Sequence, residues 1–182
     1  CSIEDYKANK IKKHEEIRPS RLKFLVELFK TTKVMGEPTL LAHNGQIDLE
    51  QFSGTKLYAF TTLDDKKHTI HRIDNPIEIA SLQQSLGNIS DFYIADGHHR
   101  IASSSLYQIS NSKNDKSNYF LSFLIDHKDL KIFEFNRIVK DIGEVSNDDF
   151  LKKIKNYFLI EKLKNHKSPS NKDEIVIYLD KK

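Results

Sequence analysis

The stretch Phe-Tyr-Ile-Ala-Asp-Gly-His-His-Arg-Ile-Ala, residues 92–102, decides the fold of this chain. Its apolar first part predicts a short buried strand at 92–95, and the residues after Gly97 predict a helix at about 98–109. A strand that passes into a helix through Asp-Gly is a place where an α/β protein can bind an anion, because the first helical N–H groups have no intrahelical partner. We therefore predict that this turn is the active or ligand-binding site.

The side chains of the turn offer different kinds of chemistry. Gly97 lets the backbone turn sharply or approach a ligand without a Cβ clash, and Arg100 can hold a phosphate or carboxylate through two parallel N–H bonds. Asp96 is placed either to cap the helix or to bind a cation or a substrate hydroxyl. His98 and His99 point to different sides of the helix start, so they cannot serve one ligand in the same way. The plainer interpretation is a capped helix with exposed histidines.

Zinc binding is the competing interpretation of the two adjacent histidines. Adjacent histidines seldom ligate one ion from a helix, where the useful spacing is i and i+4, as in His-Glu-x-x-His. The chain contains no such motif. The sequence therefore predicts no metal site.

Composition limits the class of protein. The 182 residues suit one domain, or one domain plus a small appendage, and 38% hydrophobic with 30% charged residues allows a core under a strongly charged surface. A net charge of +3, from 29 basic and 26 acidic residues, argues against nucleic-acid binding. One cysteine, Cys1, excludes an internal disulfide and suits a reducing compartment, and no apolar run reaches the length of a membrane span. We expect a cytoplasmic protein without a membrane partner; the oligomeric state stays open.

Hydrophobic patterns outside the central stretch predict an α+β fold, with one mixed sheet and helices packed against it. A polar loop or short helix is expected at 1–18, and Ser20 is expected to cap an amphipathic helix at 20–32. The almost continuously apolar run at 119–125 predicts a strand buried on both faces. Before residue 119, the other expected elements are a strand at 39–42, a hairpin of 57–62 with 68–73, a helix at 76–86 and a polar loop at 111–118. After residue 125, we expect a strand at 130–139 paired with 119–125, a mobile loop at about 162–173 and a strand at 175–179. Between 139 and 162 we expect a helix capped by Ser146, with Phe150, Leu151, Ile154 and Phe158 on one face.

Several further polar residues have both a structural and a functional interpretation. The run Lys12-Lys13-His14-Glu15 is typical of a solvated surface, and His68 and His71 suit an exposed hairpin. Arg137 interrupts an apolar strand, so it either pairs with an acidic neighbour or faces a site. The serines at 103–105 favour close helix packing over a nucleophile, because no glycine elbow flanks them.

The residues Tyr-Ile-Ala-Asp-Gly-His-His-Arg at 93–100 resemble the signature of the ParB-like proteins catalogued as the domain of unknown function 1015 family. Supporting likeness comes from the stretches 11–15, 119–124 and 133–140. The resemblance covers about residues 5–180. Members of that family are usually longer, so we expect this chain to be a middle portion of such a protein.

The resemblance implies a core like that of the ParB/sulfiredoxin superfamily over residues 1–182, whose members bind nucleotides or phosphates at a Gly-x-x-Arg turn. In this chain Gly97 and Arg100 occupy that pattern, and His14 and Arg137 join them as implied ligand- or phosphate-binding residues. Relatives with such a motif include kinases of free serine. Sulfiredoxin uses a cysteine in the corresponding turn, where this chain has histidine.

By that resemblance the expected function is phosphoryl transfer from ATP or ADP, with Mg²⁺, to a small hydroxylated metabolite such as free serine. Asp96 or Glu15 would orient or deprotonate the acceptor hydroxyl, and His98 or His99 would stabilise the developing charge. The alternative is a non-catalytic nucleotide-binding module with a regulatory or DNA-segregation-like role. A third possibility is that activity requires segments outside this chain.

Overall fold

The structure of the protein is a computed structural model that describes residues 1–133, 136–140, 143–165 and 167–179. The chain divides into two compact units, Cys1–Lys131 and Ile132–Lys182. The hydrophobic core and the predicted strand-to-helix turn lie in the first unit.

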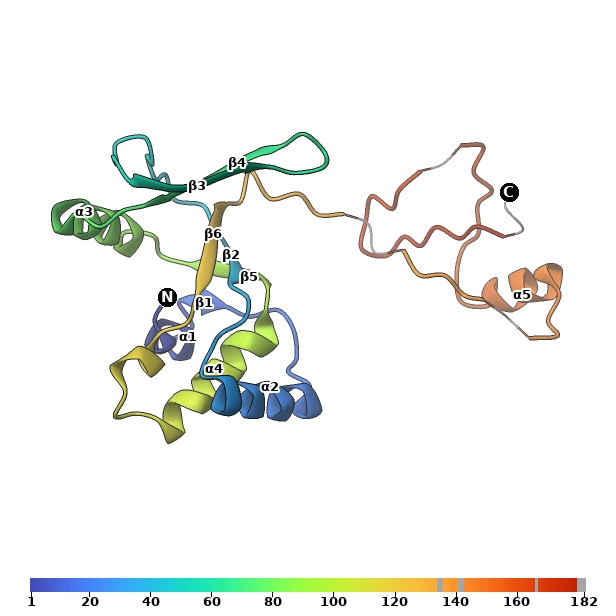
Figure 1. Cartoon of the computed structure of the whole chain (residues 1–182). Helices are drawn as coiled ribbons and strands as arrows, with labels where there is room; N and C mark the ends of the chain where they lie inside the picture. The colour runs from blue at the N-terminus through green and yellow to red at the C-terminus, as the bar shows by residue number, and fades with distance from the viewer. Residues whose placement is uncertain (134–135, 141–142, 166, 180–182) are drawn as a thin grey trace. The chain divides into compact units, whose positions relative to one another are not determined.

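The first unit is built on a four-stranded mixed sheet with the strand order β1-β5-β2-β6 (Figure 1). Strand β5 runs parallel to β1 and antiparallel to β2, and β2 runs parallel to β6. The strands are β1 (Ile11–Lys12), β2 (Thr39–His43), β5 (Phe92–Asp96) and β6 (Ser122–Asp126). Helices pack against this mixed sheet, which confirms the expected α+β class.

Three helices accompany the sheet: α1 (Ile3–Lys7), α2 (Pro19–Thr32) and α4 (His98–Ser110). Helix α4 follows β5 directly, as the sequence predicted, and α2 lies along it (Figure 1). The apolar stripe of α4 meets the sheet through Ile101, which is fully buried against Ile94 of β5 and Leu41 of β2 in the core. The rest of the core cluster comes from α1, β1 and the segment before β6: Ile3, Tyr6, Ile11 and Phe120.

The predicted hairpin and the helix after it are confirmed. Strands β3 (Thr55–Thr61) and β4 (Lys67–Arg72) form an antiparallel two-stranded sheet in which every residue is exposed. Helix α3 (Pro76–Gly87) begins with Pro76 in its first turn, and the Asn75 side chain accepts a hydrogen bond from the Ile77 amide. Proline suits this position because its missing N–H would have no intrahelical partner there.

The second unit contains α5 (Asn147–Ile154), whose N-cap is Ser146 as predicted. The Ser146 hydroxyl accepts a hydrogen bond from the Asp149 amide at 3.1 Å. Phe150, Leu151 and Ile154 are its half-buried positions, whereas Phe158 lies beyond the end of the helix.

Four further sequence predictions are wrong in the described residues. Arg18, not Ser20, is the N-cap of α2, because Pro19 takes the first helical position. Strand β6 is an edge strand and starts at Ser122, so the run 119–125 is only partly covered and Phe123 is 57% exposed. Residues 130–133 and 136–140 form no strand, with 134–135 outside the described residues, and residues 175–179 form none either. Within 1–18 the expected short helix is present as α1, and β1 follows it; the polar segment 111–118 includes a 3-10 turn, Asp115–Asn118. The prediction of a mobile loop at 162–173 falls partly on residue 166, outside the described residues; the remainder has no helix or strand.

Candidate functional site

The turn between β5 and α4 is held in a conformation that requires glycine. Gly97 has φ +97° and ψ 26°, in the left-handed region that side chains with a Cβ rarely adopt. A Cβ at this position would lie 2.9 Å from Cγ2 of Thr39 and 3.1 Å from Nε of Arg100. Thr39 is fully buried and its hydroxyl is hydrogen bonded to the Leu121 carbonyl, so it cannot move aside freely. The expected sharp turn at Gly97 is therefore present.

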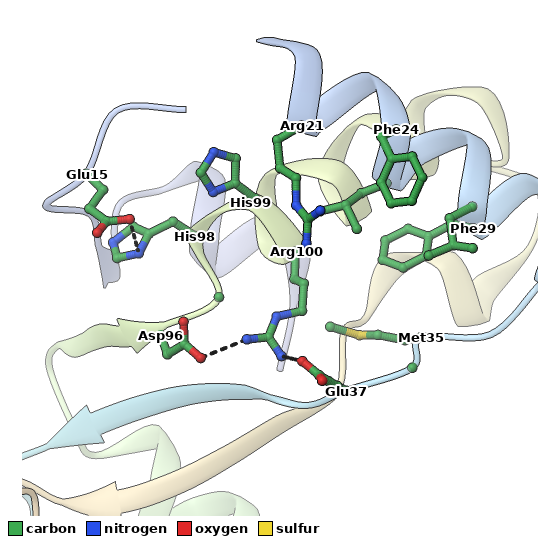
Figure 2. A pocket seen from close by; sticks show the side chains of 14 residues that line it. Glu15, Arg21, Phe24, Phe29, Met35, Glu37, Asp96, His98, His99 and Arg100 are labelled. Atoms are coloured by element: carbon green, nitrogen blue, oxygen red, sulfur yellow. Dashed lines mark hydrogen bonds and ion pairs between the residues drawn. The ribbon is translucent and has the colours of Figure 1, made fainter. Parts of the chain in front are cut away.

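Arg100 is already engaged by protein groups. Its NH1 donates to Glu37 at 2.7 Å and to the Pro38 carbonyl at 2.9 Å, and its NH2 donates to Asp96 at 2.9 Å (Figure 2). Asp96 thus pairs with Arg100 one turn later in the chain instead of capping α4, whose N-cap Gly97 has no side-chain hydrogen bond. Arg100 is largely buried, but the carboxylates of Glu37 and Asp96 are 76% and 73% exposed. An incoming anion could therefore displace either carboxylate at modest cost.

His98 is buried between two neighbours from the segment after β1. Its Nδ1 lies 3.5 Å from Oε2 of Glu15, its Nε2 accepts a 3.4 Å hydrogen bond from the His14 amide, and the two imidazole rings meet edge to face at 4.3 Å. Burial, and after it the charge of His14, lowers the pKa of His98. The neutral ring of His98 can accept from the His14 amide while its Nδ1–H points toward the Glu15 carboxylate.

His99 lies on the other side of the helix start, as the sequence analysis expected. Its Nε2 accepts a hydrogen bond from the Arg18 amide at 3.1 Å. Because Arg18 is the N-cap of α2 and makes no side-chain cap, this bond joins the beginnings of α2 and α4. His98 and His99 therefore have separate partners and separate positions.

A cavity of about 500 Å³ opens over the turn, in the size range of small-molecule sites. Figure 2 shows the side chains around it, which come from the segment after β1, from α2, from the segment before β2, and from the β5–α4 turn. Its polar lining consists of Glu15, Arg21, Glu37, Asp96, His98, His99 and Arg100, and its apolar lining of Phe24, Leu25, Leu28, Phe29 and Met35. A second hollow, formed by Arg18, Ser20, Arg21, Phe24 and His99, shares three of these residues.

Arg21 is the cation of the cavity that no carboxylate neutralises. Within the described part of the chain it has no ion pair, and its guanidinium lies 5.5 Å from the Phe24 ring centroid. Neither α2 nor α4 has a side-chain cap, so the first N–H groups of both helices remain available to an acceptor. The cavity therefore combines an unneutralised guanidinium with two positive helix ends.

The structure brings together most of the residues predicted from the sequence. Six of them line the cavity: Glu15, Asp96, Gly97, His98, His99 and Arg100. His14 is in contact with His98 at the edge of this group. Arg137 lies in the second unit, and its side chain is exposed rather than buried in a strand.

Sequence reasoning missed Arg21, Phe24 and Glu37. Arg21 and Phe24 are on the exposed part of an amphipathic helix, where charged and aromatic residues are common and carry no distinct signal. Glu37 lies beside Pro38 in a loop, and only its ion pair with Arg100 indicates a role.

Together, the fold and the cavity define a small α+β protein with a charged, solvent-open pocket at a strand-to-helix turn. The chain belongs to the family described as "Protein of unknown function (DUF1015)", whose sequence profile matches residues 1–182. No curated protein and no solved structure matches the chain. Among the described residues, the helices are too short or too polar to cross a lipid bilayer.

Proposed function

We propose that the protein binds the phosphate groups of a nucleotide in the cavity at the β5–α4 turn and transfers a phosphoryl group to a small hydroxylated metabolite such as free serine. The observation that carries this proposal is the convergence on one cavity of an unneutralised guanidinium, Arg21, and an exposed carboxylate, Glu15, beside the uncapped start of α4. Such a site offers a phosphate-binding half and a proton-accepting half.

The phosphate-binding half is formed by Arg21 and the first amides of α4. A guanidinium can bind two phosphate oxygens, and a helix N-terminus adds N–H donors and a partial positive charge. Arg100 supports this half by fixing the turn, and an exposed Glu37 can give way if phosphate contacts Arg100 directly. Phe24 lies beside Arg21 with its ring 56% exposed, and offers an apolar face to the rest of the ligand.

The catalytic half is Glu15, with His98 as a positioning residue. In the proposed step Glu15 accepts the proton of the substrate hydroxyl while that oxygen attacks the terminal phosphorus. The bond from phosphorus to the nucleotide's bridging oxygen breaks, and the shortened nucleotide leaves. Phosphoryl transfer depends mainly on positioning and charge stabilisation, so one oriented carboxylate and one cation can contribute substantially. Asp96 is held by Arg100 and is a further carboxylate at the cavity.

The nucleotide, ATP or ADP, would bring Mg²⁺ bound to its phosphates, because Mg²⁺ usually keeps several waters and takes only one or two protein carboxylates. Asp96 and Glu37 are the exposed carboxylates beside Arg100 that fit such a contact. The Gly-x-x-Arg pattern of Gly97–Arg100 at the strand-to-helix turn also supports a ParB/sulfiredoxin-like core for the first unit.

Turnover with a panel of acceptors tests the proposal. The full chain is incubated with ATP, ADP or CTP, with Mg²⁺ and with free serine and other hydroxylated metabolites, and phosphorylated product is detected by mass spectrometry. Glu15→Gln is expected to lower kcat at least 100-fold with nucleotide Kd nearly unchanged, since general-base catalysis contributes about 10²–10⁴-fold. Glu16→Gln is the matched control, because Glu16 is exposed and does not line the cavity.

Nucleotide binding is tested separately from turnover. Arg21→Gln is expected to weaken the nucleotide at least tenfold, in keeping with about 1.5–3 kcal/mol for a hydrogen bond to a charged group. Arg72→Gln, on the hairpin and paired with Asp74, should not affect binding. Tight binding without product from any acceptor would support the non-catalytic module instead. Absence of nucleotide binding by the unaltered chain would refute both functions.

A further inference from the structure

Three metal-ligating side chains from distant parts of the sequence meet at the edge of the cavity. His14, Glu15 and His98 each offer one ligand atom, and these atoms all lie within 4.8 Å of one another. His98 and His99 are adjacent on one helix, and such a pair seldom ligates one ion. The tertiary structure instead pairs one of them with a histidine and a carboxylate from the segment after β1.

We propose that His14, Glu15 and His98 form a binding site for a divalent transition-metal ion such as Zn²⁺. The coordination positions of the ion that these residues leave open would face the cavity. Two imidazoles and one carboxylate are a ligand set found in catalytic zinc sites and in non-haem iron sites. This proposal does not depend on the proposed phosphoryl transfer, because metal binding can occur whether or not the protein turns over a substrate.

The distances are close to those that coordination requires. Bonds of about 2.0–2.2 Å to nitrogen and oxygen place neighbouring ligands of a tetrahedral ion roughly 3.4 Å apart. Nδ1 of His98 and Oε2 of Glu15 are already 3.5 Å apart. His14 and Glu15 are exposed, so their side chains can rotate to close the remaining separation without disturbing the core.

His98 supplies the rigid member of the set. It is 4% exposed, yet its two nitrogens have only long contacts, 3.5 Å to Glu15 and 3.4 Å to the His14 amide. The neutral ring carries a single proton, so an ion on Nδ1 requires that proton to move to Nε2, which then faces the His14 amide N–H and can no longer accept its hydrogen bond. Metal binding should therefore shift the His14 amide away from His98, and the amide proton resonance of His14 should change.

The site differs in kind from a nucleotide-borne Mg²⁺ site. Mg²⁺ prefers oxygen ligands, whereas imidazole nitrogen favours zinc, iron, nickel or cobalt. Glu15 and His98 of the cluster line the same cavity as the two carboxylates paired with Arg100, but the nitrogen ligands are confined to the Glu15 side.

Co²⁺ binding to the full chain tests the proposal, since its visible absorption reports both binding and ligand geometry. All proteins carry Cys1→Ser, because an exposed cysteine thiol can itself bind metal. We expect one Co²⁺ per chain, displaced by Zn²⁺ and not by a large excess of Mg²⁺. His14→Gln and Glu15→Gln should each weaken Co²⁺ binding at least tenfold, and both replace exposed side chains, so folding should be preserved. His68→Gln, an exposed histidine of β4, is the matched control.

Several outcomes would overturn the proposal. The first is that no Co²⁺ binds although circular dichroism shows the chain to be folded. The second is that Co²⁺ affinity is unchanged in both His14→Gln and Glu15→Gln, and the third is that Mg²⁺ displaces the Co²⁺. A metal-induced change in the histidine resonances of the β3–β4 hairpin instead of those of His14 and His98 would also contradict it.

Discussion

At the scale of single residues, Gly97 determines whether the site can form. It places the β5–α4 turn against Thr39 and beneath Arg100, with a positive φ that L-residues avoid. Arg100 then ties the turn to the segment before β2 through Glu37 and the Pro38 carbonyl. The β5–α4 turn is therefore fixed by one glycine and one arginine, while the carboxylates of Glu37 and Asp96 beside it stay exposed.

Gly97→Ala is expected to destabilise the protein by about 1–3 kcal/mol, because left-handed backbone is unfavourable for alanine and the new Cβ meets the buried Thr39. Urea unfolding monitored by circular dichroism measures the loss. Gly87→Ala is the control: it lies in helix α3 with open space around it and should be neutral or stabilising by up to about 1 kcal/mol. Equal effects of the two changes would contradict the role assigned to the φ angle of Gly97.

At the scale of elements, the cavity depends on the packing of α2 against α4. Leu25 and Phe29 are the buried residues of α2, and the Phe29 ring meets Tyr107 of α4 edge to face with centroids 6.4 Å apart. The hydrogen bond from the Arg18 amide to His99 joins the first turns of the same two helices. Arg21 reaches the cavity only because this pairing sets the rotation of α2.

Phe29 and Phe24 of α2 allow the packing of the helix to be tested separately from the proposed contact with a ligand. Phe29→Ala should cost about 3 kcal/mol of unfolding free energy, since Phe29 is 8% exposed and its removal leaves a cavity between the helices. Phe24→Ala should change stability by less than about 1 kcal/mol, because that ring is 56% exposed, but should weaken nucleotide binding. Thermal unfolding and nucleotide titration of both variants check this. A larger stability loss for Phe24→Ala would show that α2 packs differently.

At the scale of the whole molecule, the hydrophobic core belongs to the first unit. The seven residues of the core cluster all lie between Ile3 and Phe120, within Cys1–Lys131. In the second unit, the described residues include no buried side chain, and α5 is an eight-residue helix. A helix of that length has little stability of its own.

The first unit should therefore fold by itself. A chain ending at Lys131 is expected to give a cooperative unfolding transition and dispersed amide resonances, because it keeps the whole core cluster and all four strands of the mixed sheet. It should also retain the cavity at the β5–α4 turn, whose lining residues all precede Ile101. A non-cooperative transition would mean that the second unit supplies part of the stability.

The sequence by itself determined the local elements and the character of the turn. The strand at 92–95, the helix after Gly97, the β3–β4 hairpin and the Ser146 cap follow from patterns of hydrophobicity, glycine and capping residues within a few positions. The structure places Glu15, Asp96, His98, His99 and Arg100 around one cavity, although Glu15 entered only through family resemblance, and the roles predicted for them stay predictions.

Only the tertiary structure decided the partners of these residues. The edge position of β6, the ion pairs of Arg100, the place of Arg21 and the meeting of His14 with His98 join segments far apart in the chain. Such contacts follow from how whole apolar faces of helices and sheet are buried against one another, and no short stretch of sequence specifies that packing. The described residues of 130–139 form no strand for the same reason, because an apolar run becomes a strand only where another strand pairs with it.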